Sequence, residues 1–477
     1  MNILIVTLEL APFVQINPAA ESVASLSKAL RLLGHDVNIV APRLSAYEES
    51  GVMAARQLSP LKISPLKDGG PERNAVLFDA QLSSGVKLTL VEVEASQFLE
   101  GQPLTDQAEA LGAFSEAVAA YGDLQAEQGA PFDVVHAHDA GAGLALLKLQ
   151  SVGAAGVGKV LTVHDARNAG EFSFEQGAAL GISSERLSAQ GFKSGEGICL
   201  LKGLVGEADA IVTPSNAYSR QLKAAERYGA LSRAFHSVDL IGVIEGVDHA
   251  VYNPSTDPAL ASRYDAPSPV NKARNKAAVL KEMGLDLELS RPVIFCEDVK
   301  EGDSALLTVI RALPVLVRND VTLIIAGPQE LRAEHAALIE PFAKQVCWID
   351  APQASLRRRI LAASDFYLSV QRRNPSGQRL LQASRYGAIP IALAVDSVTD
   401  LIVDCDSELH TGTGILFHSM TQRALVSASA RAVAAYRSSN WRRLLTRTMR
   451  QDLAWDRSAR RHVQIYRQVA SATAGAS

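Results

Sequence analysis

Gln371–Ala394 reads QRRNPSGQRLLQASRYGAIPIALA, which predicts a loop, a helix and a buried strand in succession. Pro375 disfavours helical backbone at Asn374, so the loop is expected there. Gly387 ends the helix and Ile389–Leu393 continues as a strand, after a helical face of Leu380, Leu381, Ala383 and Ser384. Free N–H groups at the start of such a helix would suit an anion such as a diphosphate. On pattern alone, the stretch is equally an ordinary strand–helix–strand unit of an α/β domain.

The same alternation extends through the rest of the chain. Asn2–Leu8 is a nearly continuous apolar run, typical of a strand covered on both faces, and helical periodicity follows at Glu21–Leu33. The loop between them is not G-x-G-x-x-G, so it carries no dinucleotide fingerprint. Further buried strands are expected at Asp36–Val40, Asp133–His138, Lys159–Val163, Ala210–Ser215, Pro292–Cys296, Val321–Ala326, Val346–Ile349 and Phe366–Val370.

Two similarly patterned halves follow from this reading. The turn-rich segment Val247–Asp257 is the expected hinge between them. Helices are predicted at Asp106–Gln128, Ala305–Val317, Ser355–Ala363, Thr421–Tyr436 and Trp441–Val469. The pattern therefore predicts an α/β fold with two Rossmann-like domains facing a cleft. Periplasmic-type binding proteins and some epimerases have comparable halves, so the pattern alone does not choose a function.

The composition is that of a globular protein with more than one domain. The chain has 477 residues, of which 47% are hydrophobic and 21% charged. Its net charge of −4 argues against a surface for nucleic acid or anionic membranes. The cysteines lack C-x-x-C spacing, so we expect reduced thiols and no metal site. No signal sequence and no apolar run of about 18 residues is present, which predicts a cytoplasmic protein without a membrane span.

Three histidines stand where predicted strands end. His136 and His138 close the run DVVHAH, and His164 follows LTV. Catalytic groups of open α/β sheets gather at the carboxyl ends of strands, which makes these histidines candidate site residues. His136 and His138 are equally compatible with satisfied histidines at strand ends.

The opening stretch is similar to a segment of the bacterial glycogen and starch synthases, R-F-E-P-C-G-L-x-Q-L-x-A-x-x-Y-G-x-x-P. The family's glutamate is replaced by Asn374, whereas the pattern matches at Arg372, Pro375, Gly377, Leu381, Ala383, Tyr386, Gly387 and Pro390. The resemblance extends from Met1 to about Tyr466. It includes DVVHAHD at Asp133–Asp139 and LTVH at Leu161–His164.

This resemblance implies the glycosyltransferase fold called GT-B. Residues 1–245 would form the acceptor-side Rossmann-like domain and residues 246–456 the nucleotide-sugar-side domain. Residues 457–477 would be a helix that packs back on the first domain. The family transfers glucose from ADP-glucose to an α-1,4-glucan such as glycogen, with retention at the anomeric carbon and without cofactor or metal. A glucan, or a protein partner in glycogen metabolism, is therefore the expected partner.

Several positions of the donor site depart from the family pattern. Gln15 stands where the family's first glycine loop has lysine. An ungapped alignment on Ala312–Pro314 places Val299 and Ser304 at the arginine and lysine of R-L-T-x-Q-K-G, within an acidic segment. Glu245 replaces the asparagine of N-G-x-D. Removing one preorganised hydrogen-bond donor typically lowers a rate by roughly 10²–10³. All of these substitutions are therefore expected to lower the rate of glucosyl transfer, although their effects are not additive.

Other family positions are retained. Arg372 and Gly377 remain on the donor side, beside Arg373 and Arg379. These arginines are either replacement cations for a phosphate or solvated side chains at a helix start. By resemblance, His164 and Asp139 belong to the reaction centre, and the acceptor side keeps Glu9, His136 and His138.

Two hypotheses remain for the function. In the first, the chain is a non-catalytic or strongly impaired homologue that keeps the fold and binds glucan or a partner enzyme. In the second, it is an active glycogen synthase, or a glycosyltransferase with a changed donor, that uses Arg372 or Lys300 in place of the lost cations. A small-molecule binding protein without transferase ancestry is disfavoured by the long ordered match.

Overall fold

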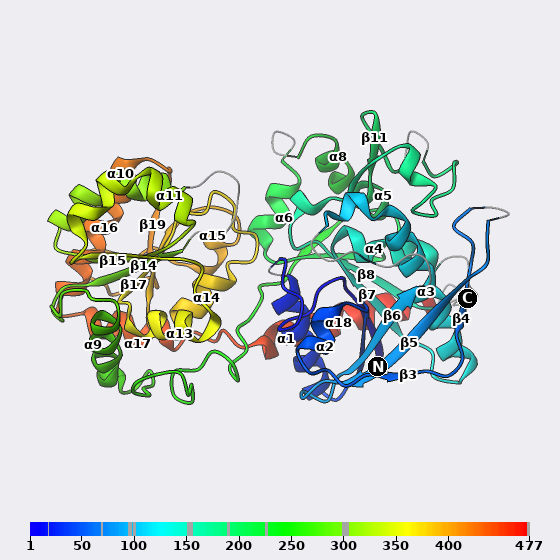
Figure 1. Ribbon diagram of the computed structural model, residues 1–477, viewed down its shortest axis with the longest axis horizontal. Helices are drawn as coiled ribbons and strands as arrows, with labels where there is room; N and C mark the ends of the chain where they lie inside the picture. Colours follow the sequence, from blue (N-terminus) through cyan, green and yellow to red (C-terminus); the bar gives the residue numbers. More distant parts are fainter. Residues whose placement is uncertain are drawn as a thin grey trace. The chain divides into compact units, whose positions relative to one another are not determined.

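The chain forms two compact units, each described by itself. The computed structural model describes residues 1–17, 19–67, 70–93, 98, 102–149, 156–187, 191–224, 228–297 and 305–474. Unit 1 comprises Met1–Gly246 and Trp455–Ser477, and unit 2 comprises Val247–Ala454. The sequence of unit 2 is therefore inserted into that of unit 1, as the colour order of Figure 1 shows.

Unit 1 is built on a ten-stranded, mostly parallel sheet. Its strand order is β13-β12-β8-β7-β1-β2-β6-β5-β3, and β4 pairs with β5. Strand β1 pairs in parallel with both β2 and β7, so the strand order reverses beside β1. Ligands of open α/β sheets bind at such a reversal. The strands are β1 Asn2–Val6, β2 Asp36–Pro42, β3 Ala55–Arg56, β4 Leu61–Ile63, β5 Arg73–Gln81, β6 Lys87–Val93, β7 Val134–His138, β8 Gly158–Thr162, β12 Ala210–Thr213 and β13 Leu240–Gly242.

Helices cover both faces of this sheet. Alternate residues of β1 face opposite layers: Ile3 and Ile5 join a core with α1 and α18, whereas Leu4 and Val6 join a core with α3 and α4. A small sheet contains β9 Glu171–Ser173, β10 Lys193–Ser194 and β11 Gly197–Cys199. The helices are α1 Ala19–Leu32, α2 Ser45–Glu49, α3 Ala108–Glu127, α4 Asp139–Lys148, α5 Leu200–Leu204, α6 Asn216–Leu222, α8 Ala230–His236 and α18 Trp455–Ala474.

Unit 2 contains a six-stranded parallel sheet with the order β16-β15-β14-β17-β18-β19. Its first strand, β14, lies inside the sheet, and the chain runs outward from β14 on one side and from β17 on the other. The strands are β14 Val293–Glu297, β15 Thr322–Ala326, β16 Val346–Ile349, β17 Phe366–Ser369, β18 Ile389–Leu393 and β19 Ile415–Phe417.

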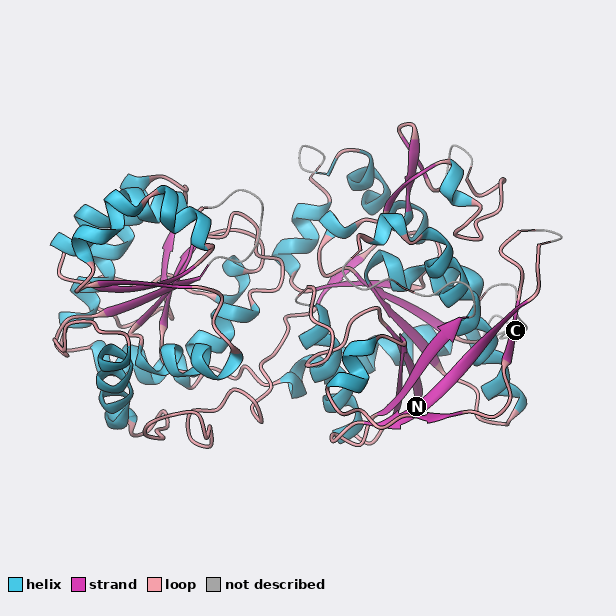
Figure 2. Cartoon of the chain, in the orientation of Figure 1, coloured by secondary structure: helices cyan, strands magenta, loops and turns pink. Residues whose placement is uncertain are grey.

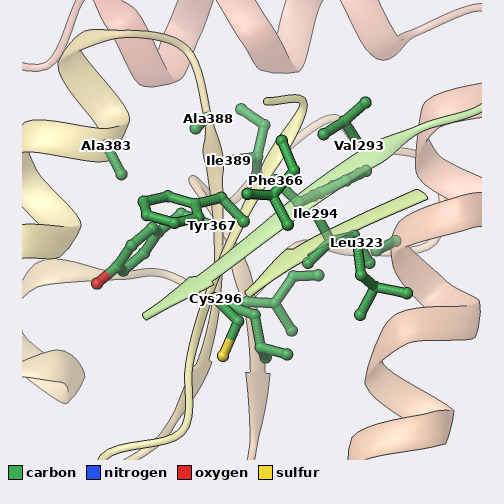
Figure 3. Packing of buried hydrophobic residues seen from close by; sticks show 14 of the residues in the cluster. Val293, Ile294, Cys296, Leu323, Phe366, Tyr367, Ala383, Ala388 and Ile389 are labelled. Atoms are coloured by element: carbon green, nitrogen blue, oxygen red, sulfur yellow. The ribbon is translucent and has the colours of Figure 1, made fainter. Parts of the chain in front are cut away.

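The helices of unit 2 lie on both faces of its sheet, as Figure 2 shows. They are α9 Lys272–Glu282, α10 Leu306–Arg318, α11 Gln329–Glu334, α12 Ala336–Ile339, α13 Ala354–Ala363, α14 Gln378–Arg385, α15 Val398–Leu401, α16 Gln422–Arg437 and α17 Trp441–Met449. Strands enclosed in this way are apolar on both faces. Figure 3 shows the resulting core, with Ile294 of β14, Leu323 of β15 and Phe366 of β17, all fully buried.

The predicted fold class is confirmed, because each unit is a Rossmann-like α/β unit. The strand predicted at Val346–Ile349 has those bounds as β16. Ser215 caps α6, since its hydroxyl accepts a hydrogen bond from Tyr218 N. None of the described helices is both long and apolar enough to cross a bilayer. The four cysteines are free.

One predicted element was wrong. Trp441–Val469, predicted as a single run of helix, is divided into α17 and α18 by residues 450–454. The division falls where the chain leaves unit 2 for unit 1. At this point Leu453 O accepts a hydrogen bond from Val247 N, and Val247 pairs with Ala454. Backbone pairing between the two junctions of unit 2 therefore replaces one turn of helix.

Candidate functional site

The ends of β7 and β8 bring three histidines to one edge of the sheet in unit 1. The two strands pair in parallel, with His136 opposite Val160 and His138 opposite Thr162. His164 follows β8 after one residue. The apolar runs that end in histidine thus position these rings as the sequence predicts, because carboxyl ends of parallel strands share one edge.

His164 connects His138 to Glu245. Its Nε2 lies 2.9 Å from His138 Nδ1, within hydrogen-bond distance, and the two rings stack. Its Nδ1 lies 3.1 Å from Glu245 Oε1, an ion-pair distance without the alignment of a hydrogen bond. The side chains of His164 and Glu245 are 7% and 6% exposed. Both ring nitrogens of His164 are therefore directed at side chains within unit 1.

Helix α18 and strand β8 each supply one hydrogen-bond partner of His136. His136 Nδ1 lies 2.7 Å from the Tyr466 hydroxyl, and Nε2 lies 2.7 Å from the Thr162 hydroxyl. His462, also on α18, has its ring centroid 5.7 Å from that of His136, and its Nδ1 donates to Ser458 O. His136 is fully buried. This is the arrangement of a satisfied histidine at a strand end.

Burial keeps most of this cluster neutral. It lowers the pKa of His136 and of His138 well below the ordinary value, and the neighbouring imidazoles add to the effect. It also lowers the pKa of His462, to about 4. For His164, burial is outweighed by the Glu245 and Asp139 carboxylates, so its pKa is raised. His164 is thus the imidazole of the cluster that favours a proton.

A small cavity of about 10 Å³ borders the cluster. Buried His138 Nε2 and Glu245 Oε2 have no hydrogen-bond partner among the residues that the structure describes. The cavity has room for about one water molecule and is far smaller than ligand pockets of roughly 300–1,000 Å³. It is lined by Ser22, Leu26, His138, Thr162, His164, Val212, Thr213, Pro214, Val243, Glu245, Trp455 and His462.

Asp139 lies directly after the histidine strand, at the start of α4. Its backbone is left-handed, with φ 61°, and its Oδ1 accepts a hydrogen bond from His164 N at 2.8 Å. Burial raises the pKa of Asp139 to about 6. Carboxyl groups with a pKa near neutrality are typical of acid–base sites.

The Glu9 carboxylate binds the loop that contains Gln15. Its Oε2 accepts hydrogen bonds from the N–H groups of Ile16 and Asn17, at 2.8 and 2.6 Å. Its Oε1 accepts from Asn17 Nδ2 at 2.6 Å. Gln15 itself is exposed. The loop N–H groups of Ile16 and Asn17, which stand where the family has a glycine loop, are therefore directed at a carboxylate of the same unit.

The Asn374 loop of unit 2 is likewise held by hydrogen bonds to groups of its own unit. Asn374 N donates to Asp396 Oδ2 at 2.5 Å, and its side-chain Oδ1 accepts from Gly377 N at 2.9 Å. Its carbonyl accepts from Ser397 N and from Ser397 Oγ. The Gly377 N–H group, at the N-cap of α14, is thus bonded to the Asn374 side chain, and Gln378 N in the first turn donates to Ser376 Oγ.

Gly377 occupies a position that other residues would strain. Its φ is 65°, and an added Cβ would lie 2.2 Å from Leu401 Cδ1. This close approach accounts for the glycine of the matched segment. Arg372, which precedes the loop, is exposed, and Arg373 is partly buried.

The chain is similar to known proteins over nearly its whole length. The starch synthase catalytic domain family matches residues 2–236. A glycogen synthase of Aromatoleum aromaticum is 30% identical over 492 residues, which covers 98% of this chain and 96% of that protein.

The chain belongs to the glycogen and starch synthase family.

Other members of the glycogen and starch synthase family also match nearly the whole chain. Glycogen synthase 2 of Agrobacterium fabrum is 29% identical over 98% of this chain and 92% of its own length. The catalytic domain of starch synthase IV from Arabidopsis thaliana, solved with ADP and acarbose, superimposes with a TM-score of 0.85. That match covers 99% of both chains at 22% identity, so it shows the shared GT-B fold.

Some family positions lie outside the described residues. Val299 and Ser304, predicted at the donor site, are among them. His164, Asp139, Glu9, His136 and His138 come together in unit 1, whereas Gln15 lies on the adjoining exposed loop. The donor-side residues Arg372, Asn374 and Gly377 belong to unit 2. Within the described ranges, no group of three His, Cys, Asp or Glu side chains is arranged to hold a metal ion.

Sequence reasoning missed a buried ionic cluster in unit 2. Glu297, the last residue of β14, pairs with Arg357 of α13 and Arg379 of α14, and accepts a hydrogen bond from Tyr367. Two signals could have found it. Glu297 ends an otherwise apolar strand, and Arg357 precedes buried Ile360 by one helical turn, on the inward face of α13.

Proposed function

We propose that this chain is a family member whose use of a sugar-nucleotide donor is lost or strongly reduced. The observation that carries the proposal is the pairing of His164. Resemblance assigns this imidazole to the donor sugar, yet its Nε2 faces His138 and its Nδ1 faces Glu245. Glu245 stands where the family has asparagine, so the substitution itself supplies the competing partner. With Nε2 bonded to His138 and Nδ1 at ion-pair distance from a carboxylate, the ring is surrounded by side chains of its own unit where the family would place a sugar hydroxyl.

Two further carboxylates support the same reading. Glu9 accepts the loop N–H groups of Ile16 and Asn17. Asp396 accepts the N–H group of Asn374, the residue that replaces the family's glutamate. Backbone N–H groups that stabilise charge in a transition state must point at the reacting atoms. Here they are directed at carboxylates of the chain, which would also repel a diphosphate.

A retained fold without donor chemistry suits a binding role. We infer that an α-1,4-glucan, or an enzyme of glycogen metabolism, is the ligand of such a protein. The support is family membership over 98% of the chain together with intact cores in both units. Cosedimentation with glycogen tests the first ligand, and depletion of the protein from the supernatant is the expected result.

One observation favours the alternative, an active synthase with a rebuilt donor site. Burial raises the pKa of Asp139 to about 6, which suits a proton-transfer role. Exposed Arg372 would then replace a lost cation. This alternative predicts saturable donor binding that is weakened at least tenfold in Arg372→Ala, because a charge-assisted bond to phosphate is removed.

Calorimetric titration with ADP-glucose, and with UDP-glucose alongside, decides between the two. Glycogen synthase 2 of Agrobacterium fabrum, titrated in parallel, is the positive control. We expect no saturable heat up to millimolar donor from protein shown to be folded by its cooperative thermal unfolding. Saturable binding followed by glucosyl transfer to glycogen would overturn the proposal.

A further inference from the structure

The ionic cluster of unit 2 lies at the position where this sheet would bind a ligand. Strand β14 has β15 on one side and β17 on the other, and the chain order runs outward in opposite directions from these two strands. In open α/β sheets, ligands bind outside the carboxyl ends of the strands at such a reversal. Glu297 is the carboxyl-terminal residue of β14. A buried carboxylate thus stands at the end of the central strand.

The contacts of Glu297 are those that a phosphate group would make. Arg357 Nε lies 3.0 and 2.9 Å from its two oxygens, and Arg357 Nη2 lies 2.7 Å from Oε1. Tyr367 OH donates to Oε1 at 2.9 Å. Arg379 Nη1 donates to Oε2. Two guanidinium groups and a phenol hydroxyl form a donor set that binds carboxylates and phosphates alike.

The cluster reaches from the core to the surface. The side chains of Glu297 and Arg357 are 3% and 10% exposed, whereas that of Arg379 is 40% exposed. Gln382 holds the second face of Arg357, because its Oε1 accepts from Arg357 Nη1 at 2.6 Å. Arg357 is therefore held by both Glu297 and Gln382. Arg379 is the more exposed of the two arginines, so an incoming anion would contact it first.

We propose that Glu297 is an internal anion that fills a phosphate-binding position of unit 2 and so excludes anionic donors from Arg357 and Arg379. This inference rests on the proposed function, since it assigns the lost donor use to one residue. Removing the charge of Glu297 leaves the Arg357 and Arg379 guanidinium groups without their anionic partner, so that they can pair with an external anion. The ligand class admitted by that change is a phosphate ester or an inorganic diphosphate.

Acid does not relieve the block. Burial disfavours the ionised carboxylate, but the two arginines outweigh burial and lower the pKa of Glu297 to about 2. The carboxylate therefore stays charged throughout the pH range in which the protein would meet a sugar nucleotide. Only a substitution tests its role.

The experiment compares Glu297→Gln with the unaltered protein and with Glu282→Gln. Glu282 pairs with Arg359 at the surface of the same unit, so its variant removes an equal charge away from the cluster. Inorganic pyrophosphate and ADP are titrated by calorimetry at low salt. We expect saturable pyrophosphate binding by Glu297→Gln, and affinity at least tenfold weaker, or no saturable heat, for either control. Adding Arg379→Ala to Glu297→Gln should abolish it.

Absence of binding by folded Glu297→Gln would overturn the inference. If that variant does not fold, Glu297→Ala removes the same charge together with the side chain that contacts Arg357 and Arg379. Pyrophosphate should then raise its Tm, and an unchanged Tm in folded Glu297→Ala would equally overturn the inference. Saturable ADP-glucose binding by the unaltered protein would overturn the proposed function instead. If neither the unaltered protein nor any variant binds pyrophosphate or ADP, the proposed function is retained and only the role of Glu297 is rejected.

Discussion

The two units place different chemistry at the carboxyl ends of their central strands. Unit 1 gathers buried imidazoles, which burial keeps largely neutral, around one His164–Glu245 pair. Unit 2 buries a fully charged carboxylate between two arginines. Both arrangements bury polar groups inside a core, but their stability depends on different conditions. A neutral network depends on pH, whereas an ion pair depends on the presence of both partners.

This difference tells which perturbation each unit resists. Protonation of a neutral imidazole creates a buried charge without a partner, so unit 1 is sensitive to mild acid. The carboxylate of unit 2 is insensitive to mild acid, because its pKa lies near 2. It is sensitive to loss of an arginine, which leaves a desolvated charge. The following substitutions and pH changes test this contrast, from the largest expected effect to the smallest.

Arg357→Ala should have the largest effect. It leaves Glu297 buried beside one partly exposed arginine, and breaking a buried pair typically costs about 3–5 kcal/mol. Arg359→Ala on the same helix removes an exposed pair with Glu282 and should cost about 0–1 kcal/mol. Urea denaturation measures both, and hydrogen exchange in β14 and α13 assigns the loss to unit 2. Equal effects of the two variants would remove the contrast between the units.

Lowering the pH from 7 to 5 should destabilise unit 1. The unfolded state binds a proton at each histidine below about pH 6.5, but native His136, His138 and His462 do not, because burial lowers their pKa. His462, whose native pKa falls to about 4, therefore costs about 2 kcal/mol at pH 5, and His136 and His138 change the stability in the same direction. His164 and Asp139 oppose this loss, because their native pKa values are raised and the native state binds those protons first.

Hydrogen exchange of α18, corrected for the intrinsic rate at each pH, measures this opening. In His462→Gln the loss between pH 7 and 5 should be about 2 kcal/mol smaller, since one neutral imidazole is removed. An unchanged pH dependence in that variant would show that the histidine cluster does not set the acid stability of unit 1.

Gly377→Ala and Gly34→Ala compare a crowded glycine with an uncrowded one. Both glycines have positive φ, 65° and 86°. An added Cβ at Gly34 meets nothing within 4 Å, so only backbone strain of about 1 kcal/mol is expected. At Gly377 it meets Leu401 and Ser397, which adds about 1–3 kcal/mol. Thermal unfolding of both variants gives the difference, and equal Tm values would contradict the close packing around the Asn374 loop.

Glu245→Asn restores the family residue beside His164 and should have the smallest effect on stability. The carboxylate that raises the pKa of His164 is removed, so this pKa should fall towards the value that burial favours. Titration of the His164 ring signals by NMR measures the direction. A pKa that stays raised would assign the effect to Asp139 instead, with Asp139→Asn as the matched control.

The strands and the loop that position the site residues could be predicted from the sequence. The apolar runs ending in His138 and leading to His164 predict strands whose carboxyl ends lie at one edge, and the structure has them as β7 and β8. Pro375 and Gly377 predict the loop before α14, which the structure also contains. These predictions succeeded because each depends on residues close in sequence, through periodicity and turn chemistry.

The side chains that pair with the site residues could not be predicted from the sequence. Glu245 lies beside His164 although 80 residues separate them in the sequence, and only the sheet order brings them together. Arg357 is one of three consecutive arginines in α13, and composition marks all three as surface residues. Helical phase separates them, because Arg357 shares the inward face with Ile360 and Leu361. Pairing between distant elements therefore required the fold.

The split of unit 1 along the chain has a consequence for synthesis. Unit 2 occupies a continuous segment whose junctions are joined by the Val247–Leu453 hydrogen bond, so it can close as soon as it has been translated. Unit 1 must wait for about 200 further residues before α18 leaves the ribosome and reaches α1 and β8. Domains generally fold as units during translation, from the N-terminus onward. Here the order is reversed: the later segment can complete its fold while the earlier one still lacks the helix that supplies Tyr466 and His462.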